Sequence, residues 1–317
     1  MKDDTMTMAP QTFKTDRMTG VLAASLTPMN NDLSADEELL FDHCQWLLND
    51  GCDGLAVLGT TGEANSFSLK ERIQIVESLV DKGIPGNKLM PGTGSAALTD
   101  AVTMTRTAVD CGAAGVLVLP PFYYKNVSDD GLFAYYSEII ERVSDDRLKI
   151  YLYHFPQMSA VPISHDLIRR LTKAYPDTVV GMKDSSGDFA NMKASVEKFP
   201  GFAVFSGADN LLLDLTRIGG AGCITATANV GAKLLAEIYK AAKAGDDAAD
   251  AQEAICDLRE VTFSRPFIAG LKGWMADHSG NAHWLNIRPP LTLLDVDMMA
   301  AHRHALEALP YQITAVD

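Results

Sequence analysis

The feature that most constrains this chain is a repeated alternation of apolar runs with amphipathic runs. The apolar runs are short and nearly continuous, which is typical of parallel strands covered on both faces. They lie at 20–29, 54–59, 88–94, 115–121, 149–156, 179–186, 202–209 and 221–230. The amphipathic runs that follow them lie at 35–50, 68–83, 97–112, 128–144, 164–176, 189–200, 210–219 and 233–245. The sequence therefore predicts eight strand–helix units.

Local features support the helices. In 128–144, apolar side chains recur at the spacing of one helical face. Ser34 with Glu37, and Ser68 with Glu71, have the spacing of a capping box. Eight such units favour an α/β fold of the (β/α)8 TIM-barrel type. A doubly wound sheet is the competing fold, but it usually has fewer repeats and often a GxGxxG turn, which this sequence lacks.

The chain divides into three predicted parts. Residues 1–17 are polar and are expected to form a disordered lead. Residues 18–245 contain the eight units and are expected to form the barrel. Residues 246–317 contain further helical runs, and we expect them to form a C-terminal helical extension packed on the barrel.

Composition excludes several classes of function. The formal net charge of −14 disfavours nucleic acid and anionic membranes as partners. No apolar run approaches the length of a membrane span, and the N-terminus lacks the hydrophobic core of a signal peptide. The five cysteines form no CxxC pair, and their odd number argues against a disulfide framework, so we expect a reducing, cytoplasmic setting. The histidines have no metal-binding spacing, and we expect neither a metal nor a cofactor.

Polar residues follow several of the predicted strands. In a barrel of this type, the chemistry lies at the carboxyl ends of the strands. The residues found there are Thr60, Thr61 and Glu63 after the second run, Tyr123 and Tyr124 after the fourth, Tyr153 and His154 at the end of the fifth, Lys183 in the sixth, and the segments SGADN and GCITATAN in the last two. These positions are the candidates for a site.

Lys183 has two interpretations. An ammonium group in an apolar strand is costly unless it is paired or loses its proton. In the structural interpretation, Lys183 pairs with Asp184 or Asp188 at a strand edge. In the functional one, it points into the barrel, where Gly181 on the same face leaves room for its stem and burial favours the neutral, nucleophilic amine. A neutral lysine of this kind forms Schiff bases.

The neighbouring candidates are ambiguous by themselves. Tyr153 is either a core tyrosine or an acid/base. Alternation places His154 on the face opposite Tyr153, so we do not expect it to be catalytic. The segment GTTGEAN is either a plain strand-to-helix turn or part of a site, and it is not a phosphate loop because the Lys-Ser/Thr ending is missing.

Taken together, these stretches resemble the dihydrodipicolinate synthase/N-acetylneuraminate lyase family. The motifs are GTTGE after the second strand, a tyrosine pair after the fourth, Y-x-x-P closing the fifth, G-x-K-D-S-S-G on the sixth and GGAGCITATANV at the eighth, and the likeness extends over about 19–310. The resemblance implies a (β/α)8 lyase whose lysine forms a Schiff base with pyruvate or another 2-keto acid. It also implies a homotetramer built as a pair of tight dimers.

The resemblance implies a role for each matching position. Lys183 is the nucleophile and Tyr153 the general acid/base. Thr60 relays protons between Tyr153 and Tyr124, which is expected to come from a neighbouring subunit. Thr61 holds the 2-keto acid carboxylate, and Gly207 and Ile224 line the pocket. A relay of this kind fits the chemistry, because an isolated phenol is a poor base at neutral pH.

Departures from the family pattern bear on the substrate. Members that make dihydrodipicolinate have an arginine two residues after the Y-x-x-P proline, where this chain has Met158. Sialic-acid lyases have Ser-Thr where this chain has Thr60-Thr61, and Asp-Glu where it has Asp209-Asn210. We therefore expect aldol cleavage or condensation of a hydroxylated 2-keto acid, such as a 2-keto-3-deoxy sugar acid.

The candidates to receive its hydroxyls are Ser206, Asp209 and Asn210. The alternatives are 4-hydroxy-tetrahydrodipicolinate synthase, a Schiff-base dehydratase or deaminase, and a non-catalytic keto-acid-binding barrel. The last predicts a lost lysine or tyrosine, yet Lys183 and Tyr153 are both present.

Overall fold

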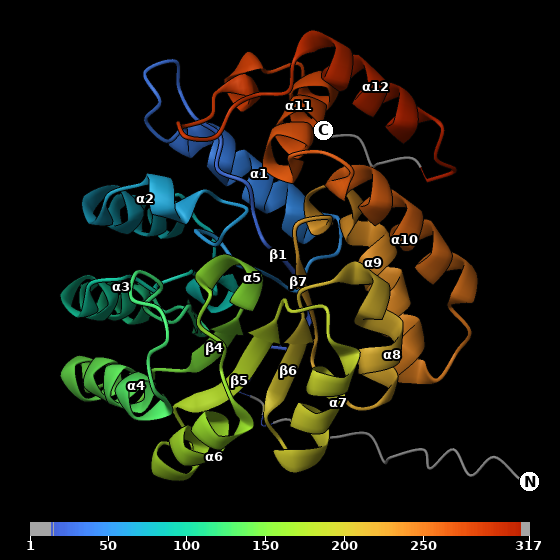
Figure 1. The fold of residues 1–317 in the computed structure, drawn as a ribbon. Helices are drawn as coiled ribbons and strands as arrows, with labels where there is room; N and C mark the ends of the chain where they lie inside the picture. The colour runs from blue at the N-terminus through green and yellow to red at the C-terminus, as the bar shows by residue number, and fades with distance from the viewer. Residues whose placement is uncertain (1–13, 15, 312–317) are drawn as a thin grey trace, which may run out of the picture.

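The computed structural model describes residue 14 and residues 16–311. Most of the predicted lead lies outside the described residues. The strands form one parallel sheet in the order β2-β1-β7-β6-β5-β4-β3, which curls around a centre with helices outside it (Figure 1). The strands are β1 (Gly20–Ala23), β2 (Gly54–Leu55), β3 (Val116–Val118), β4 (Ile150–His154), β5 (Val179–Asp184), β6 (Ala203–Ser206) and β7 (Gly222–Thr225).

The gap between β2 and β3 is closed by residues 89–93. Leu55 pairs with Leu89, and Gly92 pairs with Leu117, both in parallel orientation. The N–H of Met90 donates to Leu55 O at 2.8 Å, and the N–H of Leu117 donates to Pro91 O at 2.9 Å. The predicted third strand at 88–94 therefore takes its place in the ring, but only as isolated bridges, because Pro91 has no N–H for a regular ladder.

Helices follow the strands as the sequence predicts. They are α1 (Glu37–Asn49), α2 (Leu69–Asp81), α3 (Leu98–Asp110), α4 (Asp129–Val143), α6 (His165–Ala174), α7 (Phe189–Lys198), α8 (Leu212–Arg217) and α9 (Ala228–Ala244). A short helix that the sequence did not predict, α5 (Pro156–Ser159), follows β4, and proline occupies its first turn. Single 3-10 turns lie at η1 (Ala64–Ser66), η2 (Gly86–Lys88), η3 (Asp209–Leu211) and η4 (Ala282–Leu285).

One of the two predicted capping boxes is present. Ser68 caps α2, and Glu71 reciprocates. At α1 the prediction is wrong, because Asp36 is the N-cap and accepts a hydrogen bond from the N–H of Leu39. Aspartate and serine are equally effective N-caps, and Asp36 lies two residues after Ser34. The capping-box spacing alone therefore did not locate the start of the helix.

The barrel interior is filled by large side chains from neighbouring strands. Tyr151 is completely buried there, and its hydroxyl accepts a hydrogen bond from the N–H of Met18 at 2.9 Å. A Cβ atom at Gly181 would lie 2.6 Å from the Tyr151 ring and 2.5 Å from Ala203 O. Gly181 therefore makes room for Tyr151 and for the next strand, whereas the sequence interpretation gave that room to the stem of Lys183.

Three further helices follow α9: α10 (Ala249–Phe263), α11 (Phe267–Ser279) and α12 (Val296–Glu307). Figure 1 shows them grouped beside α9 and α1. Their buried apolar side chains, including Ile255, Leu271 and Trp284 of η4, belong to the same core cluster as α1, α2 and α9. No helix within the described part of the chain is long and apolar enough to cross a membrane.

Candidate active site

A cavity of about 330 Å³ lies at the carboxyl ends of the strands, and we call it the central cavity. Its polar lining residues are Thr60, Thr61, Tyr153, Gln157, Lys183, Ser185, Ser186 and Arg259. Its apolar lining residues are Phe155, Ala208, Ile224, Ala226, Phe263 and Phe267, with Gly187 and Gly207 completing the wall. A larger hollow of about 470 Å³ lies among α10, α11 and α12, but its described lining includes no lysine and no strand-end residue.

Lys183 is buried in the floor of this cavity without a charged partner. Its side chain is on β5 and only 6% of the residue is exposed. The ammonium nitrogen lies 4.5 Å from the centre of the Tyr153 ring. Among the described residues, no hydrogen bond or ion pair involves the Lys183 side chain. Among the described residues, therefore, no carboxylate holds this nearly buried amine.

The two aspartates considered as partners of Lys183 make their hydrogen bonds to other groups. Asp184 is completely buried and accepts hydrogen bonds from the N–H of Ser186 at 2.8 Å and from Asn191 Nδ2 at 2.7 Å. Asp188 is the N-cap of α7. The structural interpretation of Lys183 as the partner of Asp184 or Asp188 is therefore wrong, because successive residues of β5 point to opposite faces.

Tyr153 and Thr60 lie next to Lys183. Tyr153 pairs with Lys183 across the β4–β5 register, so both side chains face the cavity. The Tyr153 hydroxyl is 3.3 Å from Thr60 Oγ1. Thr60 and Thr61 come from the turn after β2, and Thr61 is buried in the cavity wall. The structure thus brings together an amine, a phenol and two hydroxyls from three separate segments.

His154 faces away from the cavity, as alternation predicts. It is buried, and its Nδ1 accepts a hydrogen bond from the N–H of Ile163 at 3.1 Å. Burial lowers the pKa of His154, and the nearby Asp184 carboxylate only partly opposes this effect. The expectation that His154 lies outside the cavity is confirmed by its position.

Tyr124 does not reach the cavity of its own chain. It is 72% exposed and packs edge-on against Tyr123, with ring centres 5.2 Å apart. Of the three hydroxyls expected to form a relay, the described chain therefore brings together two, those of Tyr153 and Thr60. Its expected third member is on the surface.

Three of the predicted substrate contacts also lie outside the cavity lining. Ser206 Oγ donates to Ala208 O at 2.7 Å, which occupies it within a turn. Asp209 is completely buried and is held by Thr227 and Arg259, at 2.7 and 2.9 Å from its Oδ2. Asn210 is exposed. Gly207 and Ile224, in contrast, line the cavity as expected. A Cβ at Gly207 would lie 2.1 Å from Ser185 Oγ, so glycine is required for this close approach.

Three lining residues come from the C-terminal helices and were not predicted. Arg259 and Phe263 are on α10, and Phe267 begins α11. The Arg259 guanidinium carbon lies 4.3 Å from the centre of the Phe263 ring, which stacks on Phe267 at 4.9 Å. These residues do not follow a strand. The expectation that site residues lie at the carboxyl ends of strands therefore could not identify them.

A buried ion pair holds the turn that carries Thr60 and Thr61. Glu63 of this turn and Lys272 of α11 are both completely buried, and Glu63 Oε1 lies 2.5 Å from Lys272 Nζ. Lys272 also donates to Asn286 O at 2.9 Å. Burial lowers the pKa of Lys272, and the Glu63 carboxylate opposes this effect.

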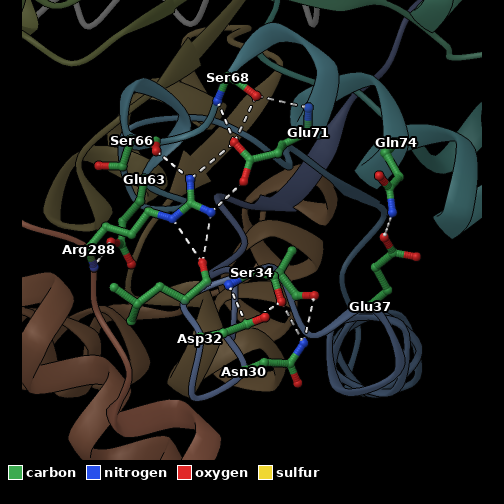
Figure 2. Close-up of polar contacts among 12 residues, drawn as sticks. Asn30, Asp32, Ser34, Glu37, Glu63, Ser66, Ser68, Glu71, Gln74 and Arg288 are labelled. Carbon is green, nitrogen blue, oxygen red and sulfur yellow. Dashed lines mark hydrogen bonds and ion pairs between the residues drawn. The ribbon is translucent and has the colours of Figure 1, made fainter.

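Arg288 also stabilises the segment that follows β2, through hydrogen bonds to its backbone and to the first turn of α2. Its guanidinium donates to Ser66 O at 2.6 Å, to Leu33 O at 2.8 and 2.9 Å, and to both carboxylate oxygens of Glu71 (Figure 2). The hydrogen bond from Arg288 lowers the pKa of Glu71 to about 2. The segment after α11 is thereby joined to the turn after β2 and to the start of α2.

Comparison with known proteins places this chain in a family. Residues 17–309 match the model of the dihydrodipicolinate synthetase family. The chain belongs to this family. It is 34% identical over 295 residues to an uncharacterized DapA-like lyase of Chloroflexus aurantiacus, covering 92% of this chain and 96% of the relative. It is accordingly a lyase of the class I aldolase type.

Solved structures support the same assignment. Dihydrodipicolinate synthase from Agrobacterium tumefaciens matches with a TM-score of 0.86 at 30% identity, over 92% of this chain and 100% of that one. YagE, a protein of the dihydrodipicolinic acid synthase family from E. coli K12 that was solved in complex with pyruvate, matches with a TM-score of 0.81 at 25% identity, over 92% of this chain and 98% of that one. The predicted (β/α)8 TIM barrel is confirmed.

The buried ion pair gives a stability prediction. Lys272→Met leaves the Glu63 carboxylate buried without a counter-charge, which typically costs about 3–5 kcal/mol. We expect the free energy of unfolding, measured with denaturant, to fall by that amount. The double variant Glu63→Gln/Lys272→Met should recover part of the loss, because it removes the unpaired charge.

The matched control is Lys193→Met, which removes an exposed lysine 3.9 Å from Glu197. Exposed pairs contribute at most about 1 kcal/mol, so this variant should unfold almost like the wild type. Equal stability of Lys272→Met and Lys193→Met would contradict the role assigned to the buried pair.

Proposed function

We propose that Lys183 forms a Schiff base with the carbonyl carbon of a 2-keto acid, with pyruvate as the small keto-acid substrate or product. The observation that carries this proposal is the nearly buried, unpaired ammonium of Lys183 beside the Tyr153 ring. YagE, which shares the fold, was solved in complex with pyruvate, and this supports the choice of keto acid. No group of three His, Cys, Asp or Glu residues in the described chain is arranged to hold a metal.

The reaction begins when the neutral amine attacks the keto carbon and water leaves, which gives an iminium ion. In the cleavage direction, Tyr153 as a base takes the proton from the hydroxyl two carbons beyond the iminium carbon. The carbon–carbon bond then breaks, an aldehyde leaves, and the electron pair is held as an enamine. Protonation of the enamine and hydrolysis release pyruvate and free Lys183. Condensation is the reverse sequence.

The neighbouring residues act on protons and on the carboxylate. Thr60 lies within hydrogen-bond distance of the Tyr153 hydroxyl and passes protons to and from it. Thr61 and adjacent backbone N–H groups hold the carboxylate of the keto acid. Gly207 and Ile224 shape the wall beside the adduct.

We further propose that the substrate is a hydroxylated 2-keto acid cleaved by the aldol route, as in a 2-keto-3-deoxy sugar acid. The synthase alternative needs an arginine for a second carboxylate at the position of Met158, which is 59% exposed and lies outside the cavity lining. Dehydration and deamination begin from the same adduct and are the remaining alternatives. A substrate panel followed by pyruvate release or consumption distinguishes them, and rapid condensation of pyruvate with aspartate semialdehyde would favour the synthase.

Tyr153→Phe tests the proton transfer directly. The ring and its packing stay, but the acid/base is lost, so kcat should fall about 10²–10⁴-fold. KM should change much less, because little ground-state binding is removed. Thr60→Val should give a milder loss of the same kind.

Tyr151→Phe is the matched control, because Tyr151 is on the same strand and, among the described residues, its hydroxyl bonds only to the backbone at Met18. It should lose about 1 kcal/mol of stability and retain its turnover. Near wild-type kcat in Tyr153→Phe would return Tyr153 to the role of a core tyrosine.

We also propose that Tyr124 completes the relay of a neighbouring subunit in a homotetramer. Its 72% exposure and its absence from the described lining of the central cavity support this arrangement. Mixing inactive Lys183→Met subunits with Tyr124→Phe subunits should raise turnover above that of either parent, because one hybrid site then has both Lys183 and Tyr124. A mixture with only the average activity of its parents, or a monomer by sedimentation, would contradict the proposal.

A further inference from the structure

One wall of the central cavity, formed by Arg259, Phe263 and Phe267, has no role in the proposed mechanism. Besides Lys183, Arg259 is the one cationic residue among the described lining, and that lining contains no aspartate or glutamate. Phe263 and Phe267 form an apolar surface beside Arg259. The lining therefore offers positive charge and aromatic carbon, and the side chains first expected to receive substrate hydroxyls are absent from it.

Arg259 is held in a fixed position by its neighbours. Its Nη1 donates to the completely buried Asp209 at 2.9 Å, and its guanidinium lies over the Phe263 ring. Within the described residues, its other N–H groups make no hydrogen bond, and 26% of the side chain is exposed. An arginine has five donors in a planar fork, so one edge can be anchored on Asp209 while another faces a ligand.

The partners of Arg259 leave it able to bind an anion. Asp209 is shared with the hydroxyl of Thr227, which donates to the same carboxylate oxygen at 2.7 Å. Asp209 is also behind the wall and completely buried, so a ligand in the cavity meets the guanidinium and not the carboxylate. A partly desolvated guanidinium that is already ordered gives a strong, directional hydrogen bond to a carboxylate.

We propose that Arg259, with Phe263 and Phe267, forms a distal subsite that binds a second carboxylate of the substrate, at the end of the chain remote from the keto group. This inference rests on the proposed Schiff base at Lys183 and narrows the proposed substrate, a hydroxylated 2-keto acid cleaved by the aldol route, to one with a second carboxylate at its remote end. The anion clamp missing at Met158 is then supplied from α10 instead of from the loop after β4.

The test compares keto acids of equal length that differ only in the remote group. The dicarboxylic set is 2-oxoglutarate and 2-oxoadipate, and the monocarboxylic set is 2-oxopentanoate and 2-oxohexanoate. Each forms an imine with Lys183 and releases water, and borohydride then reduces the imine to a stable secondary amine that mass spectrometry counts. Pyruvate is included in every series as the positive control for the Schiff base itself.

In the wild type, we expect half-maximal labelling at a concentration about tenfold to a hundredfold lower for a dicarboxylic acid than for its monocarboxylic partner, which is the range for a hydrogen bond to a charged group. Arg259→Gln should reduce this ratio to near one. Arg259→Lys should keep part of the ratio, since it retains the charge but not the fork.

Arg170→Gln is the matched control. Arg170 also pairs with an aspartate, Asp130 at 2.8 Å, and lies 4.8 Å from the centre of a phenylalanine ring, Phe133, but it is not in the cavity lining. This control should leave the ratio as in the wild type, and an equal fall in both arginine variants would overturn the assignment to Arg259.

The remaining outcomes are equally decisive. No preference for dicarboxylic acids in the wild type overturns the subsite, whatever the stability of the variants. A preference that survives in Arg259→Gln places the anion site elsewhere and also overturns the proposal. Failure of pyruvate to label Lys183 would contradict the Schiff-base proposal instead, so the two failures are distinguishable.

Discussion

The ion pair between Glu63 and Lys272 is the interaction on which the site depends. Both residues are completely buried, so each would be strongly unfavourable alone and the 2.5 Å contact between them must be maintained. Glu63 belongs to the turn that carries Thr60 and Thr61, and Lys272 belongs to the helices after the barrel. The pair therefore makes the hydroxyl-bearing turn and the C-terminal helices one unit, and Arg288 strengthens this connection through Glu71 and the backbone at Ser66.

The two buried lysines, Lys272 and Lys183, differ in the groups that surround their amines. Lys272 has a carboxylate and a backbone carbonyl as partners, which hold its charge and fix its position. Lys183 has the face of Tyr153 and no carboxylate among the described residues. The aspartate that follows it in the sequence, Asp184, bonds instead to Ser186 and Asn191 on the other side of the strand. Strand alternation thus places the amine of Lys183 on the face of β5 opposite an occupied carboxylate, and we propose that this amine is the reactive one.

Much of this arrangement could be predicted from the sequence, because strand alternation and strand-end position are local rules. They place Lys183 and Tyr153 toward the cavity and His154 away from it, and they place Thr60 and Thr61 in the cavity lining. The same rules failed where a residue's partner lies far along the chain. Gly181 makes room for Tyr151, and Asp209 is taken by Thr227 and Arg259, which no spacing in the sequence indicates. Arg259 reaches the cavity only because of how α10 packs, so the distal wall was not predictable.

The central claim is that Lys183 is the residue that joins the keto acid covalently. A crystal structure of the protein grown with pyruvate tests it most directly. The account predicts continuous electron density from Lys183 Nζ to the carbonyl carbon of pyruvate, with the pyruvate carboxylate at Thr61 and the Tyr153 hydroxyl beside the adduct. Pyruvate bound without a bond to Lys183, or bonded to another lysine, would contradict it.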